Sequence, residues 1–175
     1  MNYRCTPLSR SKIRDFAYQI RQTLHLELKL YFPVEKFLEI LHELIGDPNF
    51  SFQVIPDSEW DQMPNIHAFY NLEENCIFIR DSVYEGAANG NGRDRMTIVH
   101  ECAHAILLHC NGISLTRSFS ETVPAYCDPE WQAKCLAAEL MVPFELTKNM
   151  SAHDIAQKCG VSMAAARYQV GKRIA

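Results

Sequence analysis

The spacing of hydrophobic residues predicts helices along most of the chain. Apolar residues recur at intervals of three and four in several segments, as they do on one face of an amphipathic helix. Ser9 is a suitable N-cap for the first helix, and Asp128 followed by Pro129 is a strong helix start near the middle of the chain. The helices are expected at residues 9–24, 33–46, 93–110, 129–141, 151–160 and 162–175.

Alternating apolar and polar residues predict a small sheet between the second and third of these helices. Residues 50–54 alternate as a half-buried strand does, and residues 67–80 suit two short strands around a turn at Glu74-Asn75. We expect residues 86–92 (GAANGNG) to be a flexible connection. Residues 112–128 lack periodicity and are expected to form a long loop that acts as a lid or contacts a substrate.

These elements predict one domain with an α+β fold, mostly helical, with a small antiparallel sheet and a C-terminal helix pair. The 175 residues are 47% hydrophobic and 22% charged, which is enough to bury a core without disulfides or a structural metal. The expected parts are N-terminal helices at 1–48, a small sheet at 49–92, a central helical region at 93–143 and a C-terminal cap at 151–175.

Cysteine usage and charge narrow the class of protein. The seven cysteines include no CxxC pair, and no apolar leader begins the chain, so we expect reduced thiols and a cytoplasmic protein. Cys102 and Cys110 share a helical face and are expected to be core residues. No apolar run is long enough to span a membrane. A net charge of −4 excludes electrostatic nucleic-acid binding by the whole chain, leaving only a local basic patch.

The helix expected at 93–110 contains the sequence HECAH. His100 and His104 are four residues apart and therefore lie on one helical face, so both imidazoles can reach the same ion. Glu101 is offset by one residue and can instead take a proton from a metal-bound water. The alternative is a core helix with two satisfied histidines. The position of the motif within a well-formed amphipathic helix favours the metal site.

A catalytic zinc site needs a further protein ligand. Glu130 follows His104 by 26 residues and lies in the first turn of the next strong helix, where Ala133 and Ala137 allow close packing. An acidic residue in this position is also favoured by the helix dipole alone, so the spacing leaves both interpretations open. The other candidates are weaker, because each is more readily structural or solvated: His25, His42, His67 and His109.

Around these residues the chain resembles the ImmA/IrrE family of metallopeptidases. The segments RMTIVHECAH and EWQAKCLAAELMVP are similar to that family's Arg, Thr, HExGH and ExxANxFAxxLLMP patterns. The resemblance implies a zincin-like helical core in which His100, His104 and Glu130 bind one Zn²⁺ and Glu101 is the catalytic base. Mn²⁺ and Fe²⁺ accept the same ligands, although the Irving–Williams order favours zinc. The matching residues are Arg95, Thr97, His100, Glu101, His104, Glu130, Ala133, Ala137, Leu140 and Pro143.

Three positions depart from the family pattern. Ala103 replaces the usual Gly, Lys134 the usual Asn and Leu136 the usual Phe. If that Asn orients a metal ligand through a hydrogen bond, Lys134 alters how the ligand is held. A role without catalysis, in which the same fold binds and sequesters a regulator as in toxin–antitoxin pairs, is therefore a second hypothesis.

The resemblance also implies a class of substrate and a mechanism. Family members cut a helix-turn-helix transcriptional repressor, often encoded nearby on a phage or mobile element.

In the expected mechanism a metal-bound water attacks the peptide carbonyl directly. The candidates for stabilising the transition state are Tyr126, in the loop at 112–128, and His109. The segment 76–79 is expected to be either an edge strand that pairs with extended substrate or a plain core strand.

The C-terminal segment allows two interpretations. Residues 151–173 fit a helix, tight turn and helix, and Arg167, Lys172 and Arg173 add positive charge. The first turn of the second helix, however, offers few side chains that could read bases. A structural cap, or a surface that docks the repressor, is therefore preferred over direct DNA binding.

Overall fold

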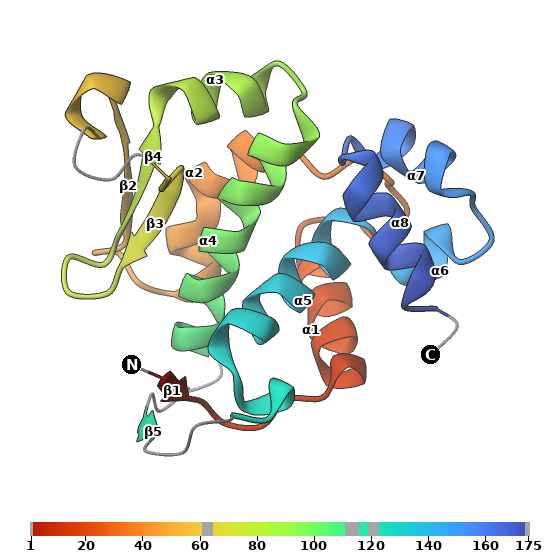
Figure 1. The fold of residues 1–175 in the computed structure, drawn as a ribbon, viewed down its shortest axis with the longest axis horizontal. Coiled ribbons are helices and arrows are strands. Elements are labelled where there is room, and N and C mark those ends of the chain that lie inside the picture. Colours follow the sequence, from red (N-terminus) through yellow and green to blue (C-terminus); the bar gives the residue numbers. More distant parts are fainter. Residues whose placement is uncertain (1, 61–64, 111–115, 119–122, 174–175) are drawn as a thin grey trace.

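A three-stranded sheet lies on one side of a long central helix, and most of the other helices lie on its other side (Figure 1). The computed structural model describes residues 2–60, 65–110, 116–118 and 123–173. Its α+β architecture confirms the predicted fold class. The helices are α1 (Arg10–Thr23), α2 (Val34–Ile45), α3 (Asp81–Ala88), α4 (Gly92–Cys110), α5 (Pro129–Met141), α6 (Phe144–Thr147), α7 (Ala152–Cys159) and α8 (Met163–Gly171), with 3-10 turns η1 (Asp57–Trp60) and η2 (Ala125–Cys127). The strands are β1 (Asn2–Arg4), β2 (Ser51–Ile55), β3 (Ala68–Asn71), β4 (Cys76–Arg80) and β5 (Thr116–Ser118).

The sheet is mixed, in the order β2-β4-β3. β3 pairs with β4 antiparallel, as expected for a hairpin, but β2 pairs with β4 in parallel, so the expectation of a purely antiparallel sheet is wrong for β2. β4 lies in the centre, and therefore residues 76–79 do not form an edge. The reason lies in their composition, because a short run that is apolar on both faces is stable only when both faces and both edges are covered.

Capping residues fix the helix ends close to the predicted positions. The Ser9 side chain accepts a hydrogen bond from the Lys12 amide at the start of α1, and Ser151 and Ser162 do the same for α7 and α8. α2 ends at Gly46, whose φ of 69° is the left-handed conformation that glycine adopts without strain. Local side-chain chemistry was therefore sufficient to predict these boundaries.

The segment between the sheet and α4 is mostly helical, so the connection expected at 86–92 is confined to residues 89–91. α3 continues to Ala88, and its buried Val83 and Ala87 have helical spacing. Gly86 stands inside α3 because a Cβ there would lie 2.0 Å from the Asp94 carboxylate. Three further elements were not predicted: α6 and the antiparallel pair of β1 with β5. β5 and η2 fall within the expected loop at 112–128, of which residues 112–115 and 119–122 lie outside the described residues.

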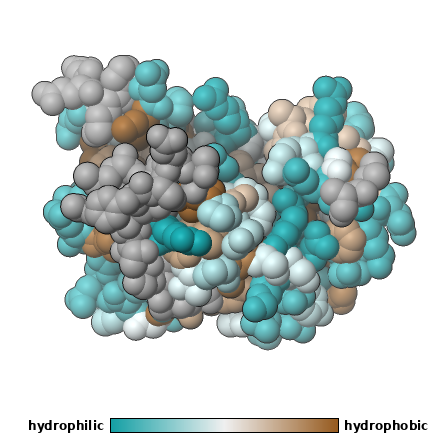
Figure 2. Space-filling view, turned by 60° about the horizontal axis from the view of Figure 1, so that its bottom comes forward, coloured by the Kyte–Doolittle hydropathy of each residue, from teal (hydrophilic) through white to brown (hydrophobic). Residues whose placement is uncertain are grey.

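The core forms around α4 and α5. Ile98, Val99, Cys102 and Ile106 of α4 are fully or almost fully buried, and most of α5 is buried, with its contacts mainly to α1 and α4. All seven cysteines lie among the described residues without forming a disulfide, and Cys110 is exposed, so its expected place in the core is wrong. No described helix combines the length and the hydropathy needed to cross a membrane. On the face shown in Figure 2, hydrophobic residues form separate patches among hydrophilic ones.

A buried carboxylate joins α1 to α5. Glu139 is only 3% exposed, and its oxygens accept hydrogen bonds of 3.2 Å from two guanidinium nitrogens of Arg14. Arg10 approaches the same carboxylate at 3.5 Å. A buried carboxylate with a bidentate arginine is costly to break, so this contact fixes α5 along the length of α1.

Arg95 ties the C-terminal helix pair to the rest of the molecule. Its guanidinium is completely buried and donates hydrogen bonds to the carbonyl oxygens of Gly160 at 2.9 Å and Phe32 at 2.7 Å, and to the Tyr31 hydroxyl. Burial lowers the pKa of the guanidinium below its usual value, with the Tyr31 contact opposing that shift. One arginine of α4 therefore holds both the turn between α7 and α8 and the segment before α2.

Gly92→Ala should destabilise the fold, because α4 begins against the backbone of the α7–α8 turn. A Cβ at position 92 would lie 2.4 Å from the Val161 carbonyl carbon and 2.5 Å from the Ser162 nitrogen. We expect a loss of about 1–3 kcal/mol in the free energy of unfolding, measured by urea denaturation. Gly171→Ala is the matched control, since its Cβ would meet nothing within 4 Å. Equal stability of the two variants would contradict this close approach.

Candidate metal centre

Two imidazoles from α4 and one carboxylate from α5 converge on a single point. The Nε2 atoms of His100 and His104 are 3.2 Å apart. The Glu130 carboxylate faces both, with Oε1 at 3.1 Å from His104 Nε2 and Oε2 at 3.3 Å from His100 Nε2. One ligand atom from each residue lies within 4.8 Å of the others, so the three side chains could hold a metal ion. The structure thus brings together the three residues predicted as ligands.

These separations suit a tetrahedral zinc ion. With bonds of about 2.0–2.1 Å, such an ion holds its ligand atoms roughly 3.3–3.4 Å apart. The observed contacts of 3.1–3.3 Å are close to this spacing. Both imidazoles are about four-fifths buried, whereas the Glu130 side chain is 57% exposed. The open side of the cluster therefore lies toward Glu130 and leaves room for a water or a substrate.

The charge of Glu130 is also that of a metal ligand. Its hydrogen bonds to His100 and His104 hold the pKa of the carboxyl far below its usual range, and partial burial opposes this only in part. The group is therefore a carboxylate near neutral pH, as coordination of a divalent cation requires.

The start of α5 is fixed by hydrogen bonds that place Glu130. The Asp128 side chain caps the helix by accepting from the Glu130 amide at 3.0 Å. The Gln132 amide group donates to the carbonyl oxygens of Thr6 and Tyr126, each at 2.8 Å. The Cys5 amide donates to Cys127 O at 2.9 Å. The N-terminal segment thus holds the turn that leads into α5, a long-range contact that the spacing of Glu130 could not indicate.

Glu101 lies beside the cluster but contacts the sheet. Its Oε2 accepts a hydrogen bond of 2.9 Å from the backbone amide of Tyr70 in β3. Burial raises the pKa of Glu101, while the nearby His100 and His104 and the Tyr70 hydrogen bond lower it in part. A carboxyl whose proton affinity is increased by burial is suited to accept and return a proton near neutral pH. In the structure Glu101 thus lies beside the three converging side chains and is not one of them.

A chain of hydrogen bonds behind Tyr70 fixes this strand against α4. The Tyr70 hydroxyl donates to Asn75 Oδ1 at 2.8 Å, and Asn75 Nδ2 donates to Asp47 Oδ2 at 2.9 Å. His109 Nε2 lies 3.1 Å from the same Asp47 oxygen. Burial raises the pKa of Tyr70 to about 12, so its hydroxyl remains a donor. These residues were not recognised in the sequence, because they come from three separate segments and match no motif.

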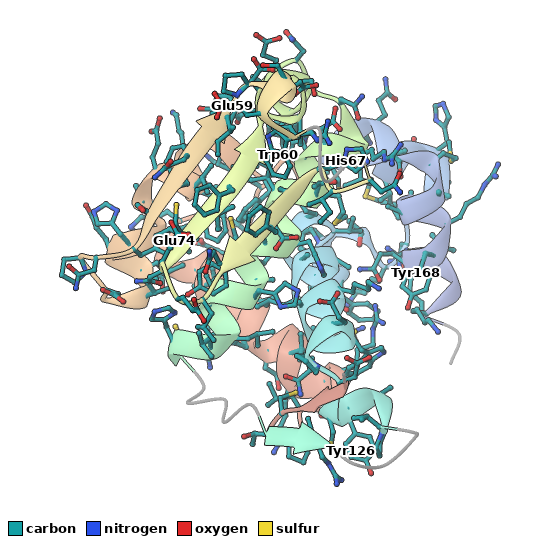
Figure 3. The ribbon with its side chains drawn as sticks, turned by 60° about the vertical axis from the view of Figure 1, so that its left-hand side comes forward. Glu59, Trp60, His67, Glu74, Tyr126 and Tyr168 are labelled. Atoms are coloured by element: carbon teal, nitrogen blue, oxygen red, sulfur yellow. The ribbon has the colours of Figure 1, made fainter. Side chains whose placement is uncertain are left out.

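The two residues suggested for transition-state stabilisation do not lie at the cluster. His109 is committed to Asp47 and, through Nδ1, to the Ala105 carbonyl at 2.8 Å. Tyr126 is exposed in η2, and its side chain lies at the far end of the molecule beside β5 (Figure 3). Both suggestions are therefore wrong. The weaker histidine candidates His25, His42 and His67 are also absent from the cluster.

Two cavities adjoin the cluster. One, of about 460 Å³, lies between β3, α4 and α5 and is lined by Glu101, Tyr70 and all three converging residues. The other, of about 500 Å³, lies between α4, α5 and α8 and also includes His100 in its wall. A ligand in the first cavity would therefore contact the three converging side chains, the candidate base and the β3 backbone together.

Comparison with known proteins agrees with this geometry. Residues 62–171 match the model of a peptidase family that is described as the IrrE N-terminal-like domain. The matched region begins before β3 and extends to the end of α8, so it contains the whole cluster and both cavities. Membership of this peptidase family implies that the protein binds a metal ion. No curated protein sequence matched the chain.

Glu130→Gln should reduce metal binding while leaving the fold intact. The substitution removes the negative charge that faces both imidazoles, on an exposed side chain that no core residue depends on. We expect the affinity for metal to fall roughly 100-fold or more. Even residues that only hydrogen-bond to a metal ligand change metal affinity by about 10–100-fold when they are replaced. Elemental analysis and competition with a chromophoric chelator measure the change. Glu43→Gln, on the exposed face of α2, is the control. Equal metal content in both variants would contradict the assignment.

Proposed function

Because the chain belongs to the IrrE N-terminal-like peptidase family, we propose that it is a zinc-dependent metalloendopeptidase. The observation that carries the proposal is the convergence of His100, His104 and Glu130, with Glu101 beside them on α4 and held by β3. In this assignment the three converging residues are the metal ligands and Glu101 is the catalytic base. Mn²⁺ and Fe²⁺ suit the same ligands, and zinc is favoured by the Irving–Williams order.

Each residue has a defined part in peptide hydrolysis. When bound, the metal lowers the pKa of a water to about 7 and polarises the substrate carbonyl. Glu101 accepts the proton of the attacking water and delivers it to the departing amine. The Tyr70 amide holds one Glu101 oxygen, so the carboxyl cannot turn away from the cluster. Two imidazoles and one carboxylate keep the position opposite them open for substrate.

The free edge of β3 is suited to hold the peptide. The Arg80 amide donates to the His67 carbonyl, which sets the alternation of the antiparallel pair. Ala68 and Tyr70 therefore direct their backbone groups away from β4, toward the cavity. The Tyr70 amide is used by Glu101, which leaves the Ala68 amide and the carbonyls of Ala68 and Tyr70 for an extended substrate. We therefore assign the pairing with substrate to β3 and not to residues 76–79, which lie in the centre of the sheet.

The proposed substrate is a specific protein, a helix-turn-helix transcriptional repressor encoded nearby. The resemblance of the motif segments to ImmA/IrrE peptidases supports this class. A regulator-binding module without catalysis is the alternative that the Lys134 departure suggested. Lys134 is exposed and lines the cavity beside α8, not the one that holds the cluster, so this departure leaves the three converging groups intact. That placement favours hydrolysis over sequestration.

Glu101→Gln should abolish cleavage and leave metal content unchanged. The amide keeps the shape of the side chain but cannot take a proton, and a positioned base contributes about 10²–10⁴-fold to the rate. The assay is fragment formation from the neighbouring helix-turn-helix protein, followed by gel and mass spectrometry, with and without a chelator. Wild-type rates in the variant would show that the base is wrongly assigned. A stable complex that yields no fragments with the parent protein would favour sequestration.

A further inference from the structure

We propose that the cavity between α4, α5 and α8 is a specificity pocket for one large apolar side chain of the substrate, next to the cleaved bond. This inference rests on the proposed peptidase function and deepens it by defining part of the recognised sequence. The cavity has a volume of about 500 Å³, within the roughly 300–1,000 Å³ range of small-molecule pockets and large enough for an aromatic ring.

The cavity adjoins the metal centre at His100. Met96 and His100 are four residues apart on α4, so they share a face, and both line the cavity. The same His100 also lines the cavity that contains Glu101 and Glu130. A peptide bound at the cluster would therefore lie next to the wall that both cavities share.

The walls of the cavity select for apolar groups. Met96 of α4, Trp131 and Ala138 of α5, and Ala165 and Tyr168 of α8 surround it. The burial of apolar surface in such a space is the main source of affinity, and its gain grows with the size of the side chain. We therefore assign the pocket to aromatic residues, leucine and methionine.

The charged groups around the cavity do not favour a cationic side chain. Gln169 accepts a hydrogen bond of 2.7 Å from Arg10, and Cys135 Sγ lies 3.7 Å from the same guanidinium. Arg93 and Lys134 line the cavity but are exposed residues, so their charges lie toward solvent. Two cations at this position disfavour a lysine or arginine of the substrate.

The arrangement of the elements separates this pocket from the β3 edge. β3 lies on one side of α4, whereas α8 lies beyond α5 on the other side (Figure 1), and the labelled Tyr168 marks α8 in Figure 3. A peptide that pairs with β3 and presents its carbonyl at the cluster can thus place an adjoining side chain toward α8. Backbone pairing would hold the peptide, and the pocket would choose the sequence.

Ala165→Phe tests the proposal by filling the pocket, with Ala164→Phe as the matched control. Ala164 is exposed on the same turn of α8 and does not line the cavity. The substrate is a combinatorial peptide library with every residue represented at each position, and cleavage products are identified by mass spectrometry. We expect the parent protein to prefer large apolar residues at one position beside the cut by about 10–200-fold. Ala165→Phe should remove most of that preference, and Ala164→Phe should keep it.

A binding measurement makes the pocket testable without catalysis. N-acetyl-phenylalaninamide should shift the NMR signals of Ala138 and Ala165 in the parent protein, and N-acetyl-alaninamide should not. Tyr168→Ala opens the pocket instead of filling it and should weaken the shifts. This second variant keeps the test usable if Ala165→Phe does not fold. Unselective or absent shifts, or an unchanged cleavage preference in Ala165→Phe, would overturn the pocket. Selective shifts without cleavage of any peptide would instead count against the peptidase function alone.

Discussion

The packing of α5 against α4 is the contact on which the rest of the site depends. A single turn of α4 can present two imidazoles, but the carboxylate that completes the set must come from another helix. Ala133 and Ala137 are fully buried on α5, and such small side chains allow the helix axes to approach closely. Only at that distance does a glutamate in the first turn of α5 reach both Nε2 atoms. Larger residues at these alanines would separate the ligands without changing any of them.

The site is supported from two directions by contacts that carry no chemistry themselves. On the sheet side, Asp47, Asn75 and the Tyr70 hydroxyl form a hydrogen-bonded chain that ends, through the Tyr70 backbone, at Glu101. On the helical side, Glu139 binds the arginines of α1 and fixes α5. Because these supports belong to separate segments, the carboxyl groups of Glu101 and Glu130 are held by different contacts. A change in the hydrogen bonds of β3 would disturb the Glu101 carboxyl while leaving the contacts of Glu130 with the two imidazoles in place.

Sequence reasoning predicted the helix ends and the residues that converge in the structure, but not the contacts that support them. His100, Glu101 and His104 could be identified because helical geometry alone relates them, and caps such as Ser9 act on neighbouring residues. Glu130 needed the family resemblance, since nothing local distinguishes a ligand from a carboxylate that stabilises a helix dipole. α3 was not predicted because Gly86 suggests a loop. In the structure, a glycine at this position leaves space for the Asp94 side chain. The parallel pairing of β2 and the contacts of His109 depend on tertiary structure and leave no local signal.

Arg95 connects the site to the C-terminal helices. It lies on α4, the helix that carries the two imidazoles, and it holds the α7–α8 pair in place. Five residues before His100, its buried guanidinium satisfies the carbonyls of Phe32 and Gly160, which would otherwise lack these donors. Gly160 has a φ of 64°, and a Cβ there would lie 2.8 Å from the Tyr31 ring, so the turn tolerates little change. The distance from α8 to α4 is thus set by rigid contacts at one end of the pair. Since the same distance sets the width of the cavity beside His100, the anchor that stabilises the fold also determines which side chains that cavity can accept.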